Sequence, residues 1–306
     1  LQVPSAYTQT NVLQKIRFKP DQHWDLQYSF HYSETSDYGR YDRHNRLKNG
    51  TARYAEWNYG PQLWLMNHFQ INHNDSNKLY DQMTLRLAQQ DFEESRIDRT
   101  LNKTDRNTQV EKVRAYSANL DFTKLLNDKH HWYYGLELVT NKVSSDGSLT
   151  DISTSAVTQG PSRYPQSTWN SLAAYLTDAY EINSKLTLQT GLRYTGYSLQ
   201  ADFSNNLPYY PLPFSKAELK NAALTGSVGL VFRPADTWVL SSNLGTAFRS
   251  PNVDDIGKIF DSEPGAVTVP NPDLKAEYAW NIDLGIAKVF SDRLKIDFTG
   301  FFTHLD

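Results

Sequence analysis

Residues 34–60 carry the side chains best suited to ligand recognition. Arginine offers a planar fork of donors that matches carboxylate and phosphate groups, and tyrosine and tryptophan offer flat contact area. The candidate ligand contacts are Arg40, Tyr41, Arg43, Arg46, Tyr54 and Trp57. Together they predict capture of an anionic or aromatic ligand. Basic residues also suit contact with the phosphate groups of a membrane surface, and this alternative stays open.

A second group of side chains is acidic and lies between Arg249 and Glu277. Carboxylates with nearby carbonyl oxygens are typical calcium ligands. The acidic residues are Asp254, Asp255, Asp261 and Glu263. A solvated loop is the ordinary interpretation of such a cluster, so the prediction of a metal site here is weak.

The sequence contains no recognisable catalytic motif. It lacks a Gly-x-Ser-x-Gly elbow, a phosphate loop, a dinucleotide fingerprint and a His-Glu-x-x-His pair. The adjacent His130 and His131 would point to opposite faces of a strand, which makes a poor chelate. We therefore expect neither an enzyme nor a bound cofactor.

Composition excludes several classes of protein. A net charge of −3 offers no basic surface for nucleic acid, and the absence of cysteine excludes disulfides and thiolate metal sites. The mean hydropathy is −0.62, and no stretch approaches the ~18 consecutive apolar residues of a membrane helix. The strands of a transmembrane barrel are only half apolar, so hydropathy does not exclude a barrel.

Residues 24–33 show the two-residue period of a β-strand, with apolar and polar side chains on opposite faces. The apolar set, predicted to face lipid, is Trp24, Leu26, Tyr28, Phe30 and Tyr32. The polar set, predicted to face the lumen, is Asp25, Gln27, Ser29 and His31.

The same pattern recurs along the chain and predicts about twelve strands, in which short turns alternate with long loops. The long loops include residues 34–60, 91–109 and 141–166. The predicted short turns lie near Asp21, Asp128, Asn183, Asp236 and Asp292. All turns would then lie on one rim and all loops on the other, which is typical of outer-membrane barrels. Trp24, Trp132 and Trp238 follow short turns and resemble an interfacial aromatic girdle.

Two short boxes carry a resemblance to a known family. The first runs from Phe248 through Arg249 to Pro251, and the second comprises Asn271, Pro272 and Leu274, with Lys275 and Glu277 close behind. They resemble the Phe-Arg-Ala-Pro and Asn-Pro-(Asp/Asn)-Leu boxes of TonB-dependent outer-membrane receptors, in the same order and at a similar separation. The amino-acid sequence of the loop between them is most similar to that of Bacteroidetes-type receptors.

The resemblance implies an all-β fold, an antiparallel transmembrane β-barrel of which these residues form about twelve of about 22 strands. It implies one partial barrel domain over residues 1–306, without the plug and without the C-terminal strands. The implied location is the bacterial outer membrane. The implied partners are TonB, through the missing plug region, and outer-membrane lipid or lipopolysaccharide.

The implied function is active uptake of a nutrient complex, an iron chelate (siderophore) or haem. Haem receptors of this family commonly place a histidine between the two boxes, and this sequence has none between Pro251 and Asn271. His44 or loop tyrosines would have to replace it. Two alternatives remain open: a passive porin or adhesin barrel, and a soluble secreted β-sheet binding protein.

Overall fold

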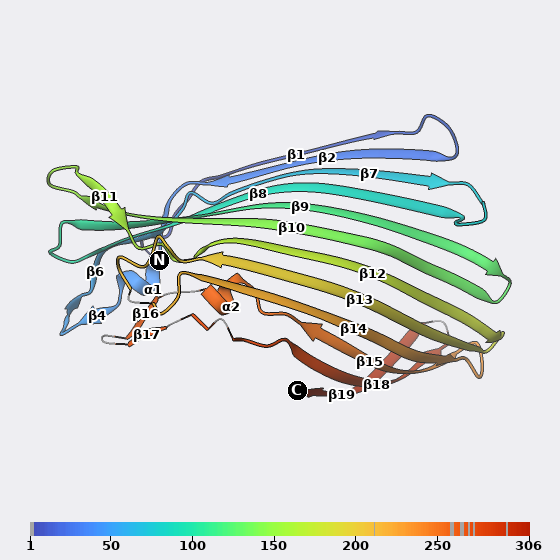
Figure 1. The fold of residues 1–306 in the computed structure, drawn as a ribbon. Coiled ribbons are helices and arrows are strands. Elements are labelled where there is room, and N and C mark those ends of the chain that lie inside the picture. The colour runs from blue at the N-terminus through green and yellow to red at the C-terminus, as the bar shows by residue number, and fades with distance from the viewer. Residues whose placement is uncertain are drawn as a thin grey trace.

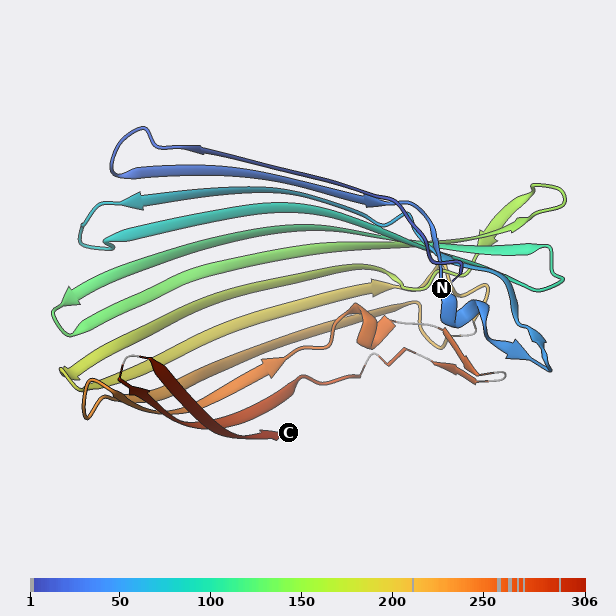
Figure 2. The same cartoon turned by 180° about the vertical axis from the view of Figure 1, so that it is seen from behind.

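The computed structural model describes residues 3–210, 212–257, 260–263, 266–268, 270–271, 273–291 and 293–306. Its main element is one antiparallel sheet in which consecutive long strands are neighbours (Figures 1 and 2). In order across the sheet they are β1 (Gln9–Phe18), β2 (Trp24–Thr35), β7 (Leu63–Asn74), β8 (Gln82–Thr100), β9 (Asp105–Asn127), β10 (His130–Asp151), β12 (Gln166–Asn183), β13 (Leu186–Asp202), β14 (Lys216–Phe232), β15 (Trp238–Arg249), β18 (Glu277–Phe290) and β19 (Leu294–Leu305).

Short elements occupy the longer connections. They are β3 (Tyr38–Gly39), α1 (Tyr41–His44), β4 (Leu47–Lys48), β5 (Thr51–Ala52), β6 (Tyr54–Tyr59), β11 (Val157–Gly160), α2 (Val253–Gly257), β16 (Phe260–Glu263) and β17 (Ala266–Thr268). Among the described residues, no helix is long and apolar enough to cross a membrane. Within the described ranges, twelve long strands in sequence order confirm the predicted antiparallel architecture.

The short turns lie at one end of the sheet and the longer connections at the other, as predicted (Figure 1). Asp21 lies within one of these turns, and Asn127 and Asn183 begin two others; each side-chain oxygen accepts a backbone N–H two residues ahead, at 2.8–2.9 Å. An Asx side chain that closes on its own backbone in this way fixes a tight reversal. The predicted turn residue Asp292 lies outside the described residues.

The strand register places apolar and polar side chains on opposite faces of the sheet, as predicted for residues 24–33. One row of directly paired residues is almost entirely apolar: Leu26, Ile71, Leu85, Leu120, Leu136, Ala174, Tyr194 and Leu224. The adjacent row is largely polar: Asp25, Asn72, Thr84, Asp121, Gly135, Tyr175, Arg193 and Thr225. These rows define the apolar face and the polar face used below.

Charged groups on the polar face are paired with one another. The Tyr175 hydroxyl donates to Asp121 at 2.6 Å, and Arg86 reaches the same carboxylate at 2.5 Å. Arg193 and Glu137 form a second ion pair at 2.8 Å. In a barrel these side chains line the lumen, so their charges are balanced within the wall itself.

The prediction of long loops is partly wrong for three segments. The segments 91–109 and 141–166 largely continue β8, β9 and β10, and the segment 34–60 contains α1 and β3 to β6. The prediction failed because the apolar period ends before the strands do. Beyond it, cross-strand charge pairs hold the ladder, for example Arg114 with Asp91 at 2.6 Å and Lys112 with Glu93 at 3.2 Å.

The sheet has one local break, between β14 and β15. These strands pair only from Ser227↔Gly245 to Phe232↔Leu240, although each is paired along its whole length with its other neighbour. They diverge toward the loop rim (Figure 2). No pairing joins β1 to β19 in the described part of the chain, so the sheet does not close on itself.

Candidate functional site

The first box turns the chain back over the polar face. Arg249 donates two hydrogen bonds to Asp255, at 2.8 and 3.0 Å, and a third to Glu277 at 3.2 Å. Pro251 is buried, and the Asn252 side chain accepts the backbone N–H groups of the first turn of α2. The box therefore starts α2 and ties it to both β15 and β18.

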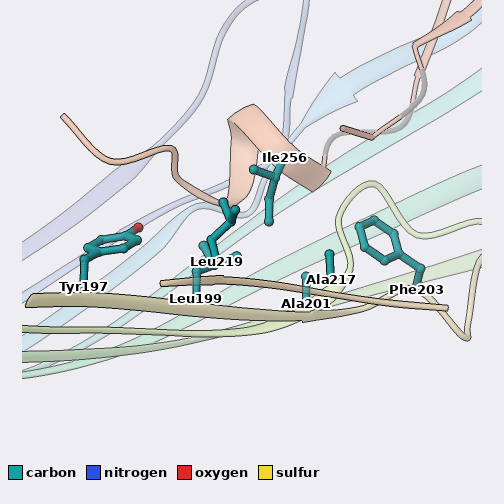
Figure 3. Packing of buried hydrophobic residues seen from close by; sticks show 7 residues of the cluster. All are labelled: Tyr197, Leu199, Ala201, Phe203, Ala217, Leu219 and Ile256. Atoms are coloured by element: carbon teal, nitrogen blue, oxygen red, sulfur yellow. The ribbon is translucent and has the colours of Figure 1, made fainter. Parts of the chain in front are cut away.

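Ile256 anchors α2 against the sheet (Figure 3). Its side chain is fully buried in a cluster that includes Leu199 and Leu219. These two residues are direct partners on β13 and β14, and they point to the same face as Arg193. On β13 and β14 the polar face thus becomes apolar toward the loop rim, and α2 covers it there.

A cavity of about 400 Å³ lies beside this cluster. Its sheet side is formed by β8, β9, β10 and β12, and its other side by the start of α2. The apolar lining residues are Phe92, Val113, Val143, Trp169 and Val253. The polar lining residues are Glu94, Arg96, Glu111, Asn141, Tyr164, Asn252 and Asp254.

A buried ion network lines this cavity. Arg96 contacts the carboxylates of both Glu94 and Glu111, and the Glu111 side chain is only 6% exposed. Burial raises the pKa of Glu111 despite the nearby arginine. Across the cavity, the Tyr164 hydroxyl donates to Asp254 at 2.7 Å, and burial raises the pKa of Tyr164.

This arrangement has a definite chemical preference. Phe92 and Trp169 offer flat apolar surface, whereas Glu94, Glu111 and Asp254 contribute three carboxyl groups against one lining arginine. Such a cavity suits a ligand with an apolar or aromatic body and an edge that donates hydrogen bonds or carries positive charge.

The predicted loop cluster is assembled only in part. The Arg40 guanidinium lies 5.1 Å from the ring centre of Trp57 and 2.7 Å from Asp42, and the Arg43 guanidinium lies 5.8 Å from the same ring. The structure thus brings Arg40, Arg43 and Trp57 together. Tyr54 instead lies 5.0 Å beneath the Arg53 guanidinium.

The other residues near this cluster are placed differently. Tyr41, the first residue of α1, and Arg46, two residues beyond its end, are both exposed. His44, considered as a haem ligand, directs its Nε2 to the backbone carbonyl of Trp57 at 3.1 Å. That nitrogen is already engaged within the loop.

The remaining predicted residues have structural roles where they are described. Phe248 packs against Tyr278 with ring centres 5.4 Å apart, and Leu274 packs against the cluster beneath α2. The Asn271 side chain accepts the Asp273 N–H at 3.0 Å. Pro272 lies outside the described residues.

The described residues of the weakly predicted metal site are engaged with other partners. Asp255 pairs with Arg249 and Asp254 bonds Tyr164. The side chains of Asp261 and Glu263 lie outside the described part of the chain. Among the described residues, no group of three acidic or histidine side chains is arranged to hold a metal ion.

Sequence reasoning missed the cavity. Its lining comes from four strands and α2, so residues as far apart as Phe92 and Asp254 meet there. One local signal was available. Glu94 and Arg96 alternate with Glu93 and Ser95 in a segment that the sequence predicts as a loop, and this two-residue spacing puts both charges on one face of a strand.

Comparison with known proteins gives a consistent result. The model of the family described as "TonB dependent receptor-like, beta-barrel" matches residues 4–306. No curated protein matches the chain. Among solved structures, the copper transporter OprC is similar with a TM-score of 0.79 and 16% identity over 99% of this chain and 46% of its own.

Two further structures are similar at low identity. The ferric yersiniabactin uptake receptor FyuA from Yersinia pestis has a TM-score of 0.71 and 13% identity, over 98% of this chain and 45% of its own. The Serratia marcescens hemophore receptor HasR, solved with its hemophore HasA and heme, has a TM-score of 0.71 and 18% identity, over 98% of this chain and 46% of its own. The chain thus spans less than half the length of these proteins.

Proposed function

Because the chain belongs to the family of TonB-dependent receptor-like β-barrels, we propose that it forms about half the wall of a receptor that imports a scarce nutrient complex. Proteins of this family lie in the outer membrane of Gram-negative bacteria, and so does this chain. Its apolar face then contacts lipid, and its polar face lines the lumen.

The observation that carries the proposal is the cavity beneath α2. It opens on the lumen side, at the rim where the long connections lie, and one of the family boxes builds its cover. A second recognition surface, Arg40 and Arg43 on Trp57, lies in a connection at the same rim. A ligand arriving from outside would meet the loop cluster first and the cavity next.

The cargo in this proposal is an iron chelate or haem, carried without chemical change. FyuA is named for a ferric chelate and HasR for a complex with heme, whereas OprC is named for copper. His44 is held by Trp57 and no histidine separates the two boxes, which favours the iron chelate over haem. Energy would come through TonB, contacted by a plug that docks on the polar face.

The test is uptake by the full-length receptor in cells with and without TonB. Cells would receive iron-55 as a panel of ferric chelates, or as haem, under iron limitation. We expect accumulation of one class, and only in cells that have TonB. Accumulation independent of TonB would point to a passive barrel. Recovery of the receptor in soluble extracts without detergent would contradict a membrane wall altogether.

A further inference from the structure

Tyr59 lies between the two recognition regions of the loop rim, the loop cluster and the cavity. It is the last residue of β6 and the direct partner of Arg96, which lines the cavity from β8. Trp57 lies two residues earlier on β6 and forms the loop cluster together with Arg40 and Arg43. Side chains two residues apart on a strand share a face, so Trp57 and Tyr59 point the same way, ~7 Å apart along the strand.

The Tyr59 side chain contacts Arg40 of the loop cluster. The Arg40 Nη1 donates a hydrogen bond to the Tyr59 hydroxyl at 2.9 Å, and the guanidinium lies 5.6 Å from the centre of the Tyr59 ring. The Trp57 ring stands edge-on to Tyr59 with ring centres 4.9 Å apart, and the same guanidinium lies 5.1 Å from its centre. A cation within ~6 Å of a ring centre is attracted to the ring. Arg40 is therefore placed by two rings and one hydroxyl.

A second cation, from the cavity, contacts the same tyrosine. The Arg96 guanidinium lies 5.5 Å from the centre of the Tyr59 ring. It also pairs with Glu94 and Glu111, and its side chain is only 17% exposed. Because the attraction between a cation and a ring is stronger where water is excluded, the ring is a substantial third contact for Arg96. Arg40 and Arg96 thus share one aromatic ring.

The backbone beside Tyr59 is closely constrained. Gly60 follows with φ of +102°, which favours glycine, and a Cβ there would lie 2.8 Å from the Ser36 carbonyl oxygen. The Gly60 N–H donates to the Ser95 carbonyl at 3.1 Å, and the Gly60 carbonyl accepts the Ser95 hydroxyl. The Tyr38 ring of β3 also packs near Tyr59, with ring centres 5.8 Å apart. The two arginines therefore take their positions from a ring that is itself held in place.

We propose that Tyr59 is a positioning residue that couples the loop cluster to the cavity. Two cations on one ring weaken each other's attachment, because like charges repel. A negative ligand group that pairs with Arg40 relieves this repulsion, and the ring then holds Arg96 more firmly beside its two carboxylates. Capture at the loop cluster in this way preorganises the cavity and sharpens its selectivity. The inference rests on the proposed function, because it concerns the same uptake site.

The experiment measures how fast phenylglyoxal modifies Arg96 in the full-length receptor without ligand, by mass spectrometry of its peptides. Arg99 is the internal control, because its side chain is 18% exposed, pairs with Glu56 and points to the opposite face of β8. We expect Tyr59→Leu to raise the Arg96 rate about fivefold, through loss of one cation–π contact. Arg40→Ala should lower the Arg96 rate about twofold, and only where Tyr59 is present.

Two further variants separate the ring from the rest of the side chain. Tyr59→Phe keeps the ring, so the Arg96 rate should stay at the wild-type value, while the Arg40 rate should rise because its hydrogen bond is lost. Tyr116→Leu removes an exposed ring from the apolar face and should change neither rate. Heat-modifiable migration on gels confirms that each variant is folded.

Three outcomes would overturn the coupling: equal Arg96 rates with and without the Tyr59 ring, an Arg40→Ala effect that persists in Tyr59→Leu, or an Arg99 rate that rises together with that of Arg96.

Selectivity is measured separately, as dissociation constants of the full-length receptor for a ferric tricatecholate, a ferric trihydroxamate and ferric citrate. Tyr59→Leu should change the ratio of the two tightest constants about fivefold, whereas Tyr116→Leu should leave it unchanged. An unchanged ratio beside an altered Arg96 rate contradicts the role of Tyr59 in selectivity. Failure of the wild-type receptor to bind any of the three chelates contradicts the proposed function, and the arginine rates still decide the coupling.

Discussion

Two regions at the loop rim offer recognition chemistry, and they are built in opposite ways. In the loop cluster around Trp57, the arginines come from one short segment and are half-buried, and the acidic partner of Arg40, Asp42, is exposed. In the cavity beneath α2, Arg96 and Glu111 come from different strands and are nearly buried. The first region is an adaptable surface, and the second is a preorganised one.

The difference lies in what each region costs the fold. Exposed ion pairs contribute little to stability, so the loop cluster can change its contacts freely. Buried charges must stay paired, so the cavity keeps its geometry whether or not a ligand is present. We infer that the cavity sets specificity and that the loop cluster sets capture. The predictions below test that division, from the largest expected effect to the smallest.

Removal of Arg96 should have the largest effect. Arg96→Ala leaves Glu94 and Glu111 close together without a cation. This loss should lower the free energy of unfolding by about 3 kcal/mol. The midpoint temperature of heat-modifiable unfolding of the purified receptor should fall clearly. The control, Arg114→Ala, breaks the exposed pair with Asp91. Its midpoint temperature should fall by only a small fraction of the Arg96→Ala decrease. Equal shifts would contradict a buried network.

Ile256→Ala should loosen α2 without unfolding the sheet. The side chain is fully buried, but α2 is a single surface turn that can relax. The substitution should therefore lower the local free energy of unfolding by about 2 kcal/mol. Limited proteolysis should cleave near α2 sooner, and chelate affinity should drop with it. Ile152→Ala, at an exposed isoleucine, serves as the control. Unchanged affinity in a receptor cleaved early would show that α2 does not cover the ligand site.

The sequence predicted the membrane-level sheet well because lipid imposes a strict two-residue period, as Leu136 and Leu138 show on β10. It did not predict the strand extensions, where both faces are wet and pairs such as Lys112 with Glu93 replace the apolar signal. The cavity could not be predicted from the sequence for another reason. Its residues meet only through the register of four strands and the return of α2.

Glu111 should give the cavity a pH dependence. Burial raises the pKa of Glu111 in the folded receptor. As the pH rises, the unfolded chain therefore loses the Glu111 proton before the folded receptor does. Stability therefore falls as pH rises from the ordinary glutamate pKa through the raised one, and is regained on acidification. Thermal midpoints measured across mildly acidic pH should show this slope. Glu111→Gln should flatten it, whereas Glu93→Gln, in an exposed pair, should not.

The smallest effect is expected in the loop cluster. Arg43→Ala with Arg46→Ala removes one cation beside Trp57 and one exposed cation, while Arg40 keeps its place on the ring. Barrel assembly should be unchanged, and capture of the chelate should weaken about fivefold, since an exposed cation–π contact is worth about 1 kcal/mol. The measurement is binding of labelled chelate to whole cells, normalised to heat-modifiable receptor.

Pro251→Ala is the opposite case in this comparison. Pro251 is buried at the turn into α2, so its replacement should reduce the amount of assembled receptor and leave near-normal affinity in what remains. Pro272→Ala is expected to behave in the same way. The division between capture and specificity fails if the arginine variant binds normally while a proline variant assembles fully and loses the chelate. In that case the box itself, and not the loop cluster, would make the first contact with the ligand.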